Sequence, residues 1–173
     1  EQSVPEAVVA SVKRRIWDSL PPLPVVPRSN RLIGRSAATQ FAREIIQKRA
    51  VGVICGPSGI GKSTVLAQLN APTARGLRYD DTPALWPWRE LLTQLAARSN
   101  SNSTITTALR LVGDDMEAGS FRQSLAVRDA LRASGADAIV IDDAQFFDTT
   151  AMQLLEFIAT QRSDADPAVL VGW

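Results

Sequence analysis

One glycine-rich stretch constrains the fold of this chain more than any other segment. It reads Gly56-Pro57-Ser58-Gly59-Ile60-Gly61-Lys62-Ser63-Thr64. The pattern is Gly-x-x-x-x-Gly-Lys-[Ser/Thr], in which the glycines let successive backbone N–H groups turn into one concavity at the amino end of a helix. Residues 51–55 predict a buried strand before it, and residues 64–69 predict a helix after it. A strand, a glycine-rich loop and a helix in this order predict a phosphate-binding P-loop.

Two side chains of this loop have predicted roles in binding a nucleotide. Lys62 is expected to reach the β- and γ-phosphates, and the hydroxyl of Ser63 is expected to ligate Mg²⁺. The remaining loop residues are expected to form the cradle with their backbone. A glycine-rich turn that carries a surface lysine is the alternative, and the flanking strand and helix argue against it.

A second informative stretch is Ala138-Ile139-Val140-Ile141-Asp142-Asp143. Its apolar residues show no alternation, which predicts a strand buried on both faces of a parallel sheet. The two carboxylates follow at the carboxyl end of this strand, the edge of an open α/β sheet at which ligands bind. We expect Asp142 to hold Mg²⁺, directly or through water, and Asp143 to polarise an attacking water. Two solvated aspartates in a strand-end turn are the alternative.

The composition excludes several kinds of chemistry. The 173-residue chain contains no histidine, which rules out Ser-His-Asp and Cys-His catalysis and histidine-containing zinc sites. Cys55 is the only cysteine, so no disulfide can form within the chain and a cytoplasmic location is expected. The net charge of +1 provides no large basic field for nucleic acid. No apolar run approaches the roughly 18 residues of a membrane span, so no membrane contact is expected.

The N-terminal part is expected to form a separate unit. Residues 4–20 predict an amphipathic helix whose basic face is interpreted as a solvated surface. Residues 21–27 are rich in proline and predict a stiff, extended connector. We therefore divide the chain into this helix and connector, residues 1–27, and a core, residues 28–173. Because the first residue is Glu1 rather than methionine, we expect the chain to be part of a longer protein.

Strand and helix patterns alternate through the core, which predicts the α/β class, a P-loop NTPase three-layer sandwich with a mainly parallel central sheet. A long insertion separates the P-loop from the acidic strand. It suits the P-loop branch that places an extra strand between these two elements. Helices are predicted over 37–49 with Ser36 as N-cap, 89–98, 104–112, 120–133, and 149–161 with Thr149 as N-cap. Further strands are predicted over 77–79, after a turn at 71–76, and over 168–172.

Together these motifs resemble the ATPase module of signal-transduction ATPases with numerous domains. These STAND proteins are relatives of the AAA+ group, and their module occurs in LuxR-type regulators and cyclase-linked proteins. The resemblance spans residues 31–173. The segments that carry it, besides the P-loop, are Arg31-Leu32-Ile33-Gly34-Arg35, Trp86-Pro87-Trp88-Arg89-Glu90 and Ile141-Asp142-Asp143-Ala144-Gln145-Phe146-Phe147-Asp148.

The resemblance implies an ATP-binding and ATP-hydrolysing switch that uses Mg²⁺. It implies that Lys62 and Ser63 lie at the phosphates, Asp142 at Mg²⁺ and Asp143 in the catalytic position. Exchange of ATP for ADP would couple to self-association or to an effector domain outside this chain. The residues that the resemblance puts beside the adenine are Arg31, Ile33, Gly34 and Arg35.

The sequence departs from the family at its carboxyl end and in one acidic residue. Family members continue after strand 168–172 into a sensor position, a last strand and a helical lid, whereas this chain ends at Trp173, so we expect an incomplete core. Asp143 stands where glutamate is commoner in AAA+ ATPases, and its shorter side chain predicts slow hydrolysis. Arg162 is a weak candidate for an arginine finger, and capping of helix-end carbonyls is its favoured role.

Three functions remain open from the sequence. The leading one is an ATP-dependent regulatory switch. The second is a DNA-associated AAA+ ATPase of the origin-recognition or transposition-regulator kind, which ATP-dependent DNA retention in a salt titration would distinguish. The third is a nucleotide-sensing interaction module that does not hydrolyse ATP. Turnover that is absent from the intact protein would favour this third function.

Overall fold

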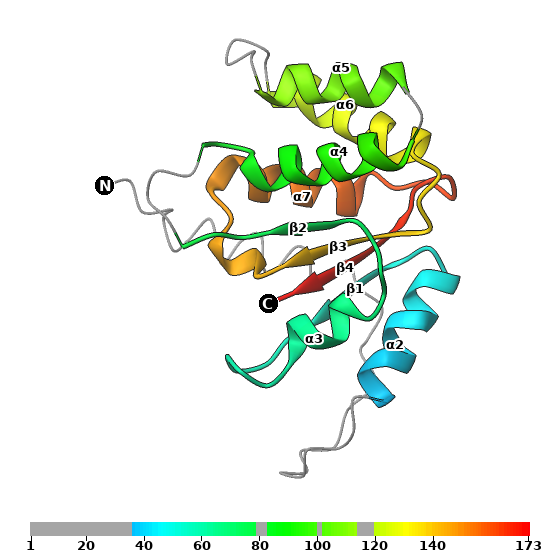
Figure 1. The fold of residues 1–173 in the computed structure, drawn as a ribbon, viewed down its shortest axis with the longest axis vertical. Coiled ribbons are helices and arrows are strands. Elements are labelled where there is room, and N and C mark those ends of the chain that lie inside the picture. Colours follow the sequence, from blue (N-terminus) through cyan, green and yellow to red (C-terminus); the bar gives the residue numbers. More distant parts are fainter. Residues whose placement is uncertain (1–35, 79–82, 100–101, 114–119) are drawn as a thin grey trace.

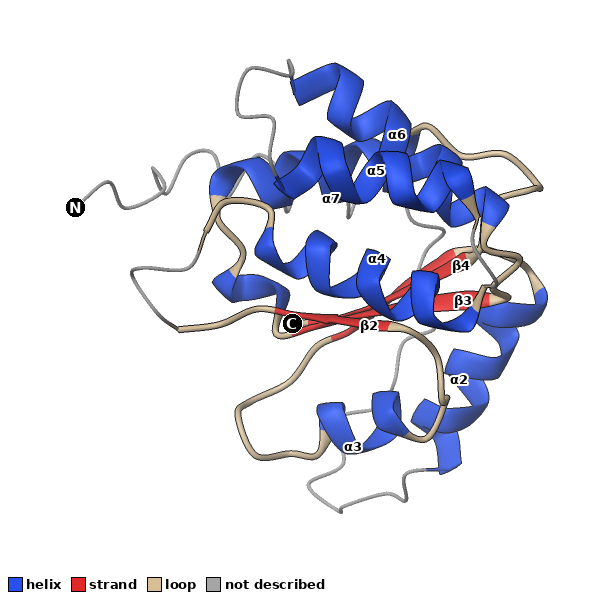
Figure 2. Cartoon of the chain, turned by 45° about the horizontal axis from the view of Figure 1, so that its top comes forward, coloured by secondary structure: helices blue, strands red, loops and turns tan. Residues whose placement is uncertain are grey.

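A computed structural model describes residues 36–78, 83–99, 102–113 and 120–173. The predicted N-terminal helix and connector, residues 1–27, lie outside these ranges. The described part is a parallel sheet with helices on both faces, which confirms the predicted α/β, P-loop NTPase-like class (Figures 1 and 2). No helix in these ranges is long and apolar enough to cross a membrane.

The sheet of the described residues has four strands, all parallel, in the spatial order β1-β4-β3-β2. The strand β4 therefore lies between the strand that leads into the P-loop and the strand that carries the aspartates, as the sequence predicts. Because all strands run in one direction, their carboxyl ends meet at one edge. The strands are β1 Val51–Ile54, β2 Thr73–Arg75, β3 Ala138–Asp142 and β4 Ala168–Gly172.

Helices cover the two faces of the sheet unequally. The helices α2 and α3 lie on one face, and α4 to α7 lie on the other, where α5 and α6 form an outer layer over α4 (Figure 1). The helices are α2 Ser36–Gln47, α3 Lys62–Ala67, α4 Trp86–Arg98, α5 Ser103–Gly113, α6 Ser120–Ala133 and α7 Thr149–Thr160, with a short 3₁₀ helix η1 at Ala144–Phe146.

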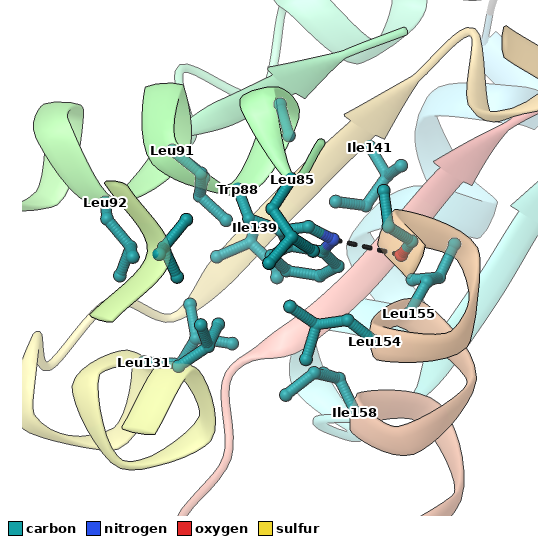
Figure 3. Packing of buried hydrophobic residues seen from close by; sticks show 14 of the residues in the cluster. Leu85, Trp88, Leu91, Leu92, Leu131, Ile139, Ile141, Leu154, Leu155 and Ile158 are labelled. Atoms are coloured by element: carbon teal, nitrogen blue, oxygen red, sulfur yellow. Dashed lines mark hydrogen bonds between the residues drawn. The ribbon is translucent and has the colours of Figure 1, made fainter. Parts of the chain in front are cut away.

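The central strands β3 and β4 are buried along their whole length, as the unbroken apolar runs predict. Their side chains alternate between two cores. Ile139 and Ile141 pack with α4 to α7, whereas Val140 packs with α2 and α3. Trp88 is the largest fully buried side chain, and its indole N–H donates to the carbonyl of Ala151 at 3.0 Å, which ties α4 to α7 (Figure 3).

The second strand lies earlier than predicted. Residues 71–76 were expected to form a turn and residues 77–79 a strand, but β2 ends at Arg75. Long-range pairing decides this outcome, because β2 aligns with β3 from Thr73 opposite Val140 to Arg75 opposite Asp142. On its other side, the amide of Gln94 in α4 receives the Thr73 N–H at 2.9 Å and donates to the Thr73 carbonyl at 2.8 Å. This side chain therefore takes the place of a neighbouring strand.

Helix starts also differ from the predictions. The helix after the P-loop begins at Lys62 rather than Thr64, and α4 begins at Trp86 rather than Arg89. The N-cap of α7 is Asp148 rather than Thr149, because the Asp148 carboxylate accepts the N–H of Ala151 at 2.8 Å.

Arg162 does cap carbonyl groups, but not those of its own helix. Its Nη2 donates to the carbonyl of Arg49 at 2.6 Å and to that of Pro167 at 2.8 Å. These carbonyls precede β1 and β4, so Arg162 lies at the amino edge of the sheet, opposite to the edge of the P-loop. Burial lowers the pKa of the Arg162 guanidinium.

An ion pair between Arg132, which is partly exposed, and the buried Asp166 ties α6 to the loop before β4. Arg132 donates to both carboxylate oxygens of Asp166, at 2.6 and 3.1 Å, and the backbone N–H of Ser163 donates to the same group at 2.6 Å. Burial by itself would raise the pKa of Asp166, but the hydrogen bonds from Arg132 and Ser163 outweigh it and hold this pKa below its ordinary value. The folded chain therefore favours the charged carboxylate.

Asp166→Asn is expected to lower the free energy of unfolding by about 2 kcal/mol at pH 7, because Nη2 of Arg132 and the N–H of Ser163 both donate to one carboxylate oxygen and lose it as an acceptor. The contribution is complete above the ordinary pKa of about 4 and is lost as the pH falls through the lower folded pKa. Urea unfolding at pH 7 and at a series of lower pH values that passes below the folded pKa of Asp166 measures this difference. The exposed neighbour Asp164→Asn is the matched control. Equal stability of the two variants at pH 7 would contradict the expectation.

Candidate functional site

The glycine-rich loop connects β1 to α3 at the carboxyl edge of the sheet. Gly59 and Gly61 have φ angles of 81° and 99°, which residues other than glycine rarely adopt. A Cβ atom at either position would meet no atom within 4 Å, so the backbone there faces open space. The loop therefore presents an accessible backbone surface at the amino end of α3. Such a surface suits an anion.

The ammonium group of Lys62 is held by the loop itself. Its Nζ donates to the carbonyl of Gly56 at 2.7 Å and to that of Pro57 at 3.1 Å. Lys62 is the first residue of α3, so its side chain starts at the mouth of the cradle. A lysine in this position carries its charge to the place where the phosphates of a P-loop ligand lie.

The P-loop helix and the acidic strand meet at one short contact. The hydroxyl of Ser63 donates to Oδ1 of Asp142 at 3.1 Å, although these residues are far apart in the sequence. Asp142 ends β3, and its side chain is only 2% exposed. The two predicted metal ligands are therefore brought together.

Arg75 binds the other oxygen of the same carboxylate. Its Nη2 lies 2.9 Å from Oδ2 of Asp142, while the arginine side chain is 54% exposed. The buried charge of Asp142 is thus balanced by a cation that reaches in from solvent. The sequence interpretation missed Arg75 because it placed the second strand after this residue. A basic side chain at the carboxyl end of a neighbouring strand is the signal that could have found it.

Asp143 occupies a left-handed backbone conformation, with φ 54° and ψ 42°. Its carboxylate accepts a hydrogen bond from the amide of Gln145 at 3.0 Å, which fixes its direction. Gly76 directly follows β2 and lies against the backbone of Asp143. A Cβ atom at Gly76 would collide with the backbone oxygen of Asp143. The Gly76 N–H also donates to the Asp142 carbonyl at 2.9 Å. The end of β2 therefore holds the backbone of Asp143 in place.

A pocket of about 310 Å³ opens between the P-loop and the end of β3. It brings the predicted residues Lys62 and Asp143 to the same space, together with Arg78, which the sequence interpretation also missed. The residues that line it are Cys55, Gly56, Ser58, Lys62, Arg78, Asp143, Gln145 and Trp173.

The donor set at this edge fits a hard divalent cation. Hydroxyl and carboxylate oxygens are ligands that Mg²⁺ prefers, and Ser63 and Asp142 supply one of each within contact distance. The guanidinium of Arg75 already provides positive charge at this carboxylate. Within the described ranges no three His, Cys, Asp or Glu side chains gather as a metal cage. A magnesium ion here would share its coordination with phosphate oxygens and water, as Mg²⁺ commonly does.

The structure does not place the residues predicted beside the adenine. Arg31, Ile33, Gly34 and Arg35 lie outside the described ranges. The P-loop residue Ile60 is 56% exposed, and its role stays a prediction.

In a comparison with protein-family models, residues 43–172 match the model described as an AAA domain. This match covers the P-loop, the acidic strand and β4. The chain matches no curated protein and no solved structure.

Proposed function

The chain belongs to the AAA domain family, and from this membership we propose that it is an ATP-binding and ATP-hydrolysing module that acts as a nucleotide-dependent switch with Mg²⁺. The observation that carries the proposal is the contact between Ser63 in α3 and Asp142 in β3, at 3.1 Å beside the open cradle. Proteins of the AAA group generally bind ATP with Mg²⁺, and this contact joins the two groups that such a ligand requires.

Binding would exchange internal contacts for contacts with the nucleotide. Lys62 would leave the carbonyls of Gly56 and Pro57 and reach the β- and γ-phosphates. Ser63 and Asp142 would hold the metal ion. When bound, Mg²⁺ supplies charge compensation to the phosphate oxygens.

Asp143 is the residue that we assign to general base catalysis. Its carboxylate faces the pocket from the end of the acidic strand and is oriented by Gln145. In hydrolysis it would accept a proton from the water that attacks the γ-phosphorus, as the bond from this phosphorus to the bridging oxygen breaks. The products are ADP and inorganic phosphate.

The internal contacts also support the role of a switch. The charge of Lys62 is satisfied by the loop, and that of Asp142 is satisfied by Arg75 and Ser63. The nucleotide-bound site would require different partners for these charges. A ligand shifts a conformational equilibrium by its different affinity for the two states. We propose that a regulatory partner or effector domain outside this chain responds to this difference.

Mg·ATP is expected to stabilise the full chain. At a free concentration of about 100 times Kd, ligand binding adds about 2.7 kcal/mol, which raises Tm by roughly 5–10 °C for a domain of this size. Thermal unfolding with Mg·ATP, with ATP and EDTA, and with Mg²⁺ alone measures the effect. The shift should require nucleotide and metal together. A Tm that Mg·ATP leaves unchanged would contradict the proposed function.

A further inference from the structure

Arg78 lines the pocket that the proposed catalytic residue Asp143 also lines. It follows β2 in the chain, two residues after Gly76, whose backbone is packed against the backbone of Asp143. Lys62 lines the same pocket. The pairing of β2 with β3 therefore brings this arginine to the side of the pocket that carries the aspartate.

An aromatic ring holds the guanidinium of Arg78 in this position. Its Cζ lies 4.3 Å from the centre of the Phe146 ring, a distance at which cation and ring attract each other. Phe146 belongs to η1, which begins immediately after Asp143. The Arg78 side chain is exposed, so its N–H groups are accessible to a ligand in the pocket. Arg78 and Asp143 are thus positioned by the same short helix.

We propose that Arg78 contacts the terminal phosphate of a bound nucleoside triphosphate and makes the site prefer a triphosphate to a diphosphate. This inference rests on the proposed function. A base that activates water for attack on the γ-phosphorus must lie near the γ-phosphate, so a cation next to Asp143 lies at that phosphate as well. Lys62, by contrast, is expected to contact the β- and γ-phosphates, and a nucleoside diphosphate still has the β-phosphate. Among the described residues that line the pocket, Lys62 and Arg78 are the two cations.

Arg78→Gln tests this inference, because it retains a polar side chain and removes the charge. Isothermal titration of the full chain with Mg·ADP and with the non-hydrolysable analogue Mg·adenylyl-imidodiphosphate measures both affinities. The Kd of the triphosphate analogue should rise at least about 10-fold, the loss of one charge-assisted hydrogen bond, while the Kd of ADP changes less than about 2-fold. The matched control is Arg110→Gln, an exposed arginine on α5 in the outer helix layer, which should leave both values unchanged.

Arg78→Lys is a second variant that keeps the charge but loses the planar guanidinium, and it should weaken triphosphate binding by an intermediate factor of about 3. If Arg78→Gln does not fold, the test rests on whether Arg78→Lys weakens binding of the triphosphate analogue more than binding of ADP. Equal weakening of both nucleotides, or no weakening of either, would overturn the inference. If the wild-type chain binds both nucleotides and the ratio of their affinities is the same in the variants, only the role of Arg78 is wrong. A wild-type chain that binds neither nucleotide would overturn the proposed function as well.

Discussion

Lys62→Ala is expected to weaken Mg²⁺-dependent ATP binding at least about 100-fold, which corresponds to about 2.7 kcal/mol. The ammonium group is held beside the loop by two loop carbonyls, which it would exchange for phosphate oxygens when the nucleotide binds. Its loss removes the charge-assisted hydrogen bonds to two phosphate groups. Isothermal titration with Mg·ATP measures the change in Kd.

The fold should tolerate this substitution. Lys62 is the first residue of α3, and alanine is the strongest helix former. Lys48→Ala is the matched control, because Lys48 is an exposed lysine that follows α2 away from the pocket. Circular dichroism should give the same spectrum for both variants. Wild-type affinity for ATP in the Lys62→Ala variant would be incompatible with the P-loop assignment.

Asp143→Asn is expected to reduce ATP turnover by about 10²–10⁴-fold and to change the Kd of Mg·ATP by less than about 3-fold. An amide cannot accept the proton of the attacking water, which is the step that we assign to this carboxylate. Single-turnover release of phosphate measures the rate, and titration measures the affinity. The exposed Asp164→Asn serves as the control, with wild-type values expected for both.

Asparagine suits the backbone of this position unusually well. The left-handed conformation of Asp143 is one that asparagine adopts more readily than most residues. Its amide oxygen can still accept the hydrogen bond from Gln145, so the change removes the base and keeps the geometry. Unchanged turnover would rule out Asp143 as the base. A wild-type protein that binds ATP without turnover would favour the nucleotide-sensing interaction module instead.

The local motifs were predictable because their information is local. Glycine adopts the positive φ angles of Gly59 and Gly61 far more readily than other residues do, so the residue types alone predict the conformation of the loop. The apolar run before Asp142 is buried on both faces, as unbroken hydrophobicity predicts. The meeting of Ser63 with Asp142 also followed from the rule that parallel strands share a carboxyl edge.

The second strand was not predictable in the same way. Thr73–Arg75 is too short to show a period, and it is a strand because β3 pairs with one side of it and the Gln94 amide binds the other. Both partners are distant in the sequence. Strand propensity depends on such neighbours more than on the residues themselves.

The phosphate cradle, the acidic strand and the α/β class follow from the sequence alone, because each depends on residue type and periodicity within a short segment. The tertiary structure alone decided which cations stand beside the aspartates. Arg75 meets Asp142, and Arg78 meets the ring of Phe146, only through the register of β2 against β3. A slip of one residue in this register would turn the Arg75 side chain to the opposite face of the sheet. Long-range packing sets that register, and no local pattern encodes it.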